Sequence, residues 1–94
     1  MLVLVAYDVS TGTPAGIRRL RRVAQACKDY GQRVQKSVFE CRVGPPQWVG
    51  LRARLLDEID AAEDSLRFYF LDEDTPIEHH GSDSPPDLEG PLIV

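Results

Sequence analysis

The chain has 94 residues, of which 43% are hydrophobic and 28% are charged, and its formal net charge at pH 7 is −4. This length predicts one domain, near the lower limit for an independent hydrophobic core. No apolar run approaches the roughly 18 to 20 residues that cross a membrane. The N-terminus has no basic leader with a cleavage site, which predicts a cytoplasmic protein without a membrane partner.

The net charge conceals two halves of opposite sign. Residues 1–50 carry eight Lys and Arg against three Asp and Glu, a balance of +5, whereas residues 51–94 have a balance of −9. An acidic chain can therefore still bind nucleic acid if the basic side chains of its first half form a patch. Cys27 and Cys41 are too few for a metal cluster and too far apart for a redox pair, so we interpret them as small apolar residues.

The first elements are predicted from apolar patterning and capping residues. Residues 1–8 predict a strand that is apolar on both faces and ends at Asp8. Thr13 or Ser10 can then cap a helix with Pro14 in its first turn. This helix is expected to run to about Asp29 and to stop at Gly31.

The second half of the chain predicts two short strands, a helix and a last strand. Residues 33–43 favour two strands with a turn near Lys36 and Ser37, and Pro45 and Pro46 then start a helix over about 46–60. The apolar stripe of this helix consists of Trp48, Leu51, Leu55 and Ile59. Residues 65–71 predict a strand with one face made of Leu66, Phe68 and Phe70.

The order β-α-β-β-α-β is typical of a ferredoxin-like α+β fold, an antiparallel sheet with two helices on one face. Residues 1–75 form this predicted domain, and residues 76–94 form an acidic, proline-rich tail. Because the first strand is apolar on both faces, the helix-free face needs a cover as well. A second copy of the chain is the simplest cover, which predicts a homodimer.

The first predicted helix carries four arginines within five positions. Its expected core stripe is Ile17, Leu20, Ala24 and Cys27, with Val23 at the edge, so Arg18 and Arg22 point away and Arg19 and Arg21 flank them. The run has no acidic residue four positions away on the helix. Guanidinium groups suit phosphate oxygens, so these arginines are candidate contacts to a nucleic-acid backbone. A solvated charged face is the alternative.

Three segments together resemble the family of CRISPR-associated protein two. They are YDV at the end of the first strand, RRLRRVAQACKDYGQRVQKSVFEC over 18–41, and SLRFYFL over 65–71. The resemblance covers about residues 1–71. It implies a ferredoxin-like homodimer in which Asp8 of each protomer faces the two-fold axis and holds magnesium, replaceable by manganese. It also implies the CRISPR-associated integrase subunit and duplex DNA or single-stranded RNA as partners, and the segment Leu92–Val94 as an extra strand on the partner's sheet.

The resemblance also assigns roles to single residues. Asp8 becomes the catalytic metal ligand, because a carboxylate at a strand end can coordinate a hard cation and two-fold pairing supplies a second one. Arg33 becomes a phosphate contact, and the residues expected to line the site are Tyr7, Ser10 and Phe39. The alternatives are that Asp8 caps the following loop amides and that the aromatic residues belong to the core. His79 and His80 lack a further ligand at regular spacing, which disfavours a metal site there.

Two functions are compatible with these residues and motifs. The favoured one is an adaptor in CRISPR spacer acquisition that binds nucleic acid as a dimer and bridges integrase subunits. It is favoured because each protomer supplies only one candidate catalytic carboxylate. The alternative is a metal-dependent endoribonuclease or endodeoxyribonuclease whose main role is phosphodiester cleavage. A small-molecule sensor with the same fold is disfavoured by the arginine run and the quoted motifs.

Overall fold

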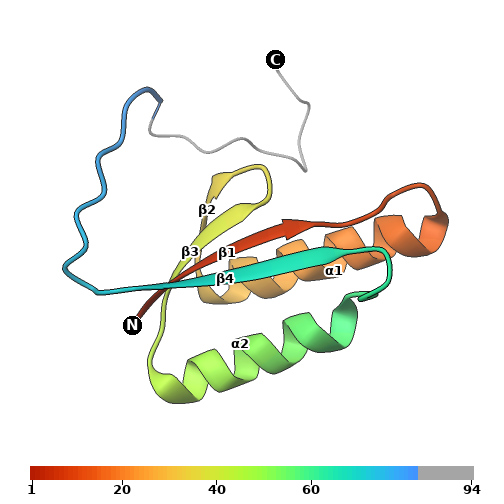
Figure 1. Cartoon of the computed structure of the whole chain (residues 1–94), viewed down its shortest axis with the longest axis horizontal. Coiled ribbons are helices and arrows are strands. Elements are labelled where there is room, and N and C mark those ends of the chain that lie inside the picture. Colours follow the sequence, from red (N-terminus) through yellow and green to blue (C-terminus); the bar gives the residue numbers. More distant parts are fainter. Residues whose placement is uncertain (83–94) are drawn as a thin grey trace.

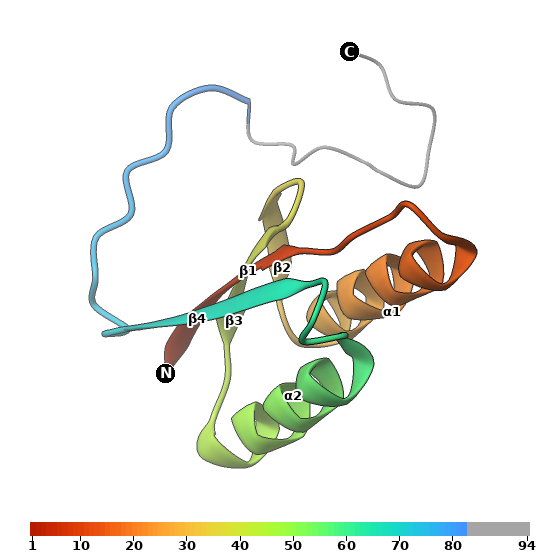
Figure 2. The same cartoon turned by 45° about the vertical axis from the view of Figure 1, so that its right-hand side comes forward.

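The computed structural model describes residues 1–82. Its elements are β1 (Leu2–Asp8), α1 (Pro14–Tyr30), β2 (Gln32–Gln35), β3 (Val38–Arg42), α2 (Pro45–Glu58) and β4 (Ser65–Leu71). The strands form one antiparallel sheet in the order β2-β3-β1-β4, and both helices pack on the same face of it (Figures 1 and 2). The predicted ferredoxin-like α+β fold is therefore confirmed.

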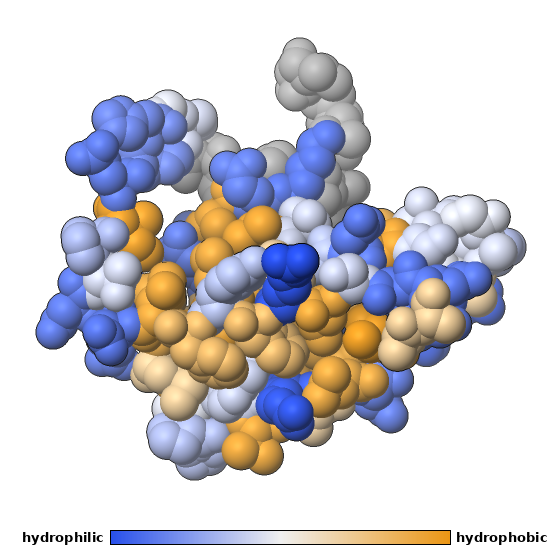
Figure 3. Space-filling model, viewed as in Figure 1, coloured by the Kyte–Doolittle hydropathy of each residue, from blue (hydrophilic) through white to orange (hydrophobic). Residues whose placement is uncertain are grey.

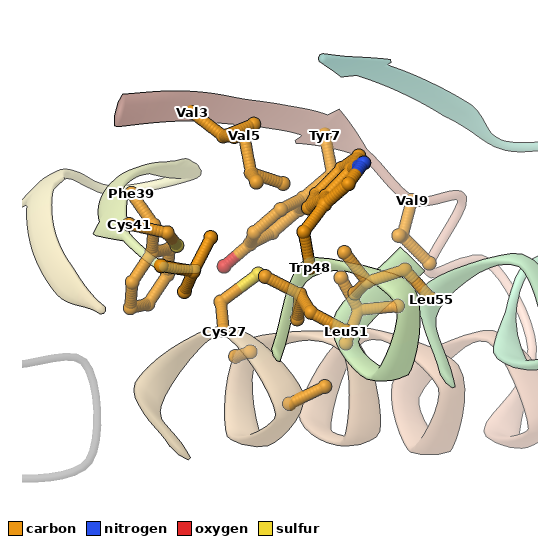
Figure 4. Packing of buried hydrophobic residues seen from close by; sticks show 14 residues of the cluster. Val3, Val5, Tyr7, Val9, Cys27, Phe39, Cys41, Trp48, Leu51 and Leu55 are labelled. Carbon is orange, nitrogen blue, oxygen red and sulfur yellow. The ribbon is translucent and has the colours of Figure 1, made fainter. Parts of the chain in front are cut away.

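The central position of β1 explains its apolar sequence. β1 pairs with β3 on one side and β4 on the other, and its alternate residues Val3, Val5 and Tyr7 point toward the helices and are buried. They pack with the two helices around Leu51 and Leu55 of α2 (Figure 4). The core therefore lies between the sheet and the helix pair.

Both ends of α1 follow the expected capping signals. The Gly16 amide donates to Thr13 Oγ1 at 3.1 Å, Pro14 begins the first turn, and Gly31 caps the last turn by donating its amide to the Cys27 carbonyl. The predicted core stripe is wrong at one position, because Ile17 is 47% exposed whereas Val23 is fully buried. The helix turns its glycine, Gly16, toward the preceding loop, which moves Ile17 out of the interface.

The second helix and the last strand match their predictions closely. α2 begins at Pro45, one residue earlier than expected, and buries Trp48, Leu51 and Leu55, with Ile59 partly buried. The Trp48 ring meets the rings of Phe68 and Phe70 edge-on, with centroid distances of 4.8 and 5.4 Å. These contacts fix β4 against the first turns of α2.

The helix-free face of the sheet carries an apolar strip together with charged side chains, because Arg67 and Glu40 lie on it opposite Ala6 and Leu4. Leu4 and Ala6 of β1 lie on it half-buried, beside Tyr69 of β4, which is 43% exposed. Figures 1 and 3 look onto this face, and Figure 3 shows an apolar band that crosses it between hydrophilic margins. The prediction that β1 is apolar on both faces is confirmed, and the homodimer stays a prediction.

Residues 72–82 follow β4 without a helix or strand. Glu73 accepts a hydrogen bond from the N-terminal amine of Met1 at 2.8 Å, which holds the start of this segment beside β1. The predicted extra strand at Leu92–Val94 lies outside the described residues. No helix within residues 1–82 is long and apolar enough to span a bilayer.

Candidate functional site

Asp8 is an exposed carboxylate at the end of the central strand. It is the last residue of β1 and lies opposite Ser65, the first residue of β4. Within residues 1–82 its side chain makes no hydrogen bond or ion pair, so both oxygens are available. An available carboxylate at this position suits an oxygen-binding cation.

The loop after Asp8 is capped by a different acid. The Ser10 amide donates to Asp64 Oδ1 at 3.0 Å, and the amide of Asp60 donates to the second oxygen of the same carboxylate at 2.9 Å. The alternative that Asp8 caps the loop amides is thus wrong, because Asp64 already occupies that role. The Arg19 guanidinium and these backbone amides lower the pKa of Asp64 to about 2.

The four arginines of α1 fall into three environments. Arg18 and Arg21 are exposed and have no acidic partner in the described part of the chain. Arg22 is 66% exposed and lies 3.8 Å from Glu58. An exposed ion pair at this distance contributes little to the stability of the fold. Arg19 is only 17% exposed, because it donates to Asp64 at 2.9 and 3.3 Å.

Three residues expected near the site belong to the core side of the sheet. Phe39 is fully buried and Tyr7 nearly so, with ring centroids 6.2 Å apart, so neither is available to stack on a base in this chain. Strand alternation explains this correction, because Tyr7 points to the face opposite that of Asp8. The Arg33 guanidinium lies over the Phe39 ring, 5.1 Å from its centroid, and is half-buried.

Two polar atoms of this region are buried without a hydrogen-bond partner among the described residues, the Tyr7 hydroxyl and Arg33 Nε. Burial raises the pKa of Tyr7 above its usual value, although the neighbouring Arg33 opposes the shift. Arg33 therefore touches the core through Phe39 and Tyr7, and its role as a phosphate contact stays a prediction.

The remaining candidates lie apart from Asp8. Ser10 is exposed two residues beyond it, with its amide held by Asp64. His80 contacts Glu78 at 2.7 Å in the segment after β4. Cys27 and Cys41 are free and buried, as the sequence indicated. Across residues 1–82, no group of three or more His, Cys, Asp or Glu side chains is arranged to hold a metal ion.

A magnesium ion fits this donor set only in part. Asp8 supplies one hard oxygen ligand that is exposed and not engaged elsewhere, which suits the cation. A single carboxylate does not complete a site. A second Asp8 from another copy of the chain would provide the missing ligand, and water would fill the other positions.

Asp64 is a residue of this region that the sequence did not point to. Its partner Arg19 lies 45 residues earlier in the chain, so no local spacing connects the two. The one available signal is the acidic pair Glu63 and Asp64 directly before β4, a pattern that also occurs in solvated loops.

Comparisons with known proteins identify the family. Residues 1–76 match the family described as CRISPR associated protein Cas2. The CRISPR-associated endoribonuclease Cas2 of Chlorobaculum tepidum is 62% identical over 96 residues, covering 100% of both chains. The CRISPR-associated endonuclease Cas2 of Halalkalibacterium halodurans is 52% identical over 95 residues, covering 99% of each.

A solved structure agrees with these sequences. The crystal structure of Streptococcus pyogenes Cas2 at pH 6.5 superposes with a TM-score of 0.75 at 54% identity, covering 86% of this chain and 100% of that one. The order of helices and strands and the structural likeness agree with the family match over residues 1–76. The chain belongs to the CRISPR-associated Cas2 family.

Proposed function

We propose that the protein acts in CRISPR spacer acquisition as a homodimer that binds nucleic acid and bridges integrase subunits. The observation that carries this proposal is the outward side of α1, where Arg18 and Arg21 are exposed without an acidic partner in the described residues. Such guanidinium groups bind phosphate oxygens whatever the base sequence. Family membership supports the setting in CRISPR defence.

The dimer in this proposal uses the helix-free face of the sheet. That face presents Leu4, Ala6 and Tyr69, and the strand end with Asp8 lies at its margin. Burying an apolar face against its own copy stabilises the pair and brings two equivalent carboxylates toward one axis. Each dimer would then carry two arginine-bearing helices, one on each side.

A second candidate function is magnesium-dependent phosphodiester cleavage. It is favoured by the free carboxylate of Asp8 and by the names endoribonuclease and endonuclease that the relatives carry. When bound, magnesium, or manganese in its place, supplies positive charge against phosphoryl oxygens and a more acidic water. The residues of this chain would hold the cation through Asp8 and the substrate backbone through Arg18 and Arg21.

One set of measurements tests both functions. Wild type, Asp8→Asn and the double variant Arg18→Gln/Arg21→Gln are compared for duplex binding, for magnesium-dependent cleavage of RNA and DNA, and for spacer integration with the integrase subunit. We expect Asp8→Asn to abolish cleavage, because the amide lacks the charge that holds the cation. The same variant should still bind duplex and support integration.

The arginine variant gives the opposite pattern. It should bind duplex more weakly, with a slope of log affinity against log salt that is smaller by about two units, and it should integrate poorly. An unchanged slope would contradict the proposed interface. An Asp8→Asn protein that folds and binds duplex but loses integration would favour the enzyme over the adaptor.

A further inference from the structure

The carboxylate of Asp64 is the most heavily engaged acid in the described chain. Its side chain has no exposed surface. It accepts hydrogen bonds from the amides of Ser10 and Asp60, and from Arg19 through Nε at 2.9 Å and Nη2 at 3.3 Å. Four donors from three separate segments therefore converge on one side chain, which we call the Asp64 anchor.

The Asp64 anchor holds the backbone just after β1, which ends at Asp8, and just before β4, which begins at Ser65. Asp64 directly precedes Ser65, the residue paired with Asp8, and Ser10 follows Asp8 by two residues. The backbone on either side of the exposed carboxylate is thus tied to one buried group. Gly16 of α1 lies close against the same loop, because a Cβ at this position would lie 2.0 Å from the Ser10 carbonyl oxygen.

The anchor also removes Arg19 from the exposed arginine face. Its side chain is 17% exposed, and its guanidinium contacts both Asp64 and, at 3.5 Å, Glu63. A phosphate would have to displace a charge-assisted, two-point interaction before it could reach this side chain. Arg18 and Arg21 face no such competition.

We propose that the Asp64 anchor positions Asp8 for cation binding, and that Arg19 acts through this anchor rather than as a phosphate contact. The first half rests on the proposed function, since it takes Asp8 as the cation ligand. The second half is independent of any metal.

The second half is tested by the salt dependence of duplex binding. Single variants Arg19→Gln and Arg18→Gln are compared with wild type between low and moderate salt. Arg18→Gln should reduce the slope by about one unit, because one phosphate contact is lost. Arg19→Gln should leave the slope unchanged. A reduction of about one unit in Arg19→Gln overturns the assignment.

The first half is tested by Mn²⁺ binding to the protein without nucleic acid, followed by electron paramagnetic resonance of the free ion. Asp64→Asn should weaken Mn²⁺ affinity by about tenfold, the lower range for loss of a group that orients a ligand. Asp29→Asn is the matched control. Asp29 also receives an arginine hydrogen bond at 2.9 Å, from Arg54, but lies at the other end of α1.

Folding of each variant is checked by thermal unfolding, and all binding is measured well below the unfolding transition.

Arg19→Lys provides a second variant, which keeps the positive charge and loses the two-point hydrogen bonding to Asp64. We expect its Mn²⁺ affinity to lie between those of wild type and Asp64→Asn. Wild-type affinity in both Asp64→Asn and Arg19→Lys overturns the positioning role alone. If Asp8→Asn binds Mn²⁺ as tightly as wild type does, the metal role of Asp8 itself is overturned.

Discussion

Asp8 and Asp64 show how strongly position decides what an aspartate does. They lie next to the same strand pair, yet one carboxylate is exposed and unengaged while the other is enclosed by four donors. The free group can accept a cation, whereas the enclosed group organises the backbone around it. Neither role is evident from residue type, because both positions are simply an acid beside a β-rich segment.

The enclosed carboxylate of Asp64 makes the free energy of unfolding depend on pH in the acidic range. The Arg19 guanidinium and backbone amides lower the pKa of Asp64 to about 2, below its value in an unfolded chain. A depressed pKa stabilises the fold at all pH values above the unfolded pKa, and this contribution is lost as pH falls from about 5 to about 2. We expect urea unfolding midpoints to fall over this range, and to fall less steeply in Asp64→Asn. An equal pH dependence in both proteins would contradict the assignment.

The two cysteines should be unreactive in the folded protein. Burial raises the pKa of Cys27 to about 12 and that of Cys41 to about 11, so few thiolates form at pH 8 and reagents have no access. We expect a chromogenic disulfide reagent to label neither thiol in buffer and both in concentrated urea. Rapid labelling in buffer would show that the packing around β3 and α1 opens readily.

At the scale of elements, local signals predicted where α1 begins and ends. Thr13, Pro14 and Gly31 act on neighbouring backbone groups, so their effects need no knowledge of the rest of the fold. The predicted buried face of α1 was less accurate, because Ile17 is exposed. The engagement of Arg19 was not predicted at all, because its partner comes from the segment before β4.

Because α1 packs closely against the preceding loop, we expect one added methyl group at Gly16 to lower the free energy of unfolding. Gly16→Ala would place a Cβ against the Ser10 carbonyl, and relief requires the loop or the helix to move. We expect a loss of about 1 to 3 kcal/mol in the free energy of unfolding, typical of overpacking. Gly12→Ala is the control, since a Cβ there meets nothing within 4 Å. Equal stability of the two variants in urea titrations would contradict the close approach.

At the scale of the whole molecule, the sheet was predictable because alternation and strand order are visible in the sequence. Val3, Val5 and Tyr7 face the helices, and Leu4 and Ala6 lie on the other face, as the apolar pattern on both faces of β1 predicted. The candidate site was less predictable. Tyr7 and Phe39 were placed near Asp8 by resemblance, but the pleat of the sheet directs them into the core.

The apolar helix-free face predicts a homodimer that one charge can weaken. Tyr69 lies on this face beside Leu4, is 43% exposed and accepts a hydrogen bond from Arg67 at 3.2 Å, so Tyr69→Glu would replace this contact and bring a carboxylate from each copy into the interface. We expect the dimer dissociation constant, measured by sedimentation equilibrium, to rise at least about tenfold, or about 1.4 kcal/mol.

The control for this variant uses an exposed apolar side chain outside the sheet. Val49 is 67% exposed on α2, so Val49→Glu adds the same charge to the helix side of the molecule. It should leave the dimer intact, because the proposed interface is the opposite face. A wild-type monomer at tens of micromolar would refute the dimer. Dissociation by Val49→Glu but not by Tyr69→Glu would move the interface to the helices, and the two Asp8 carboxylates would then have no common axis at which to share a cation.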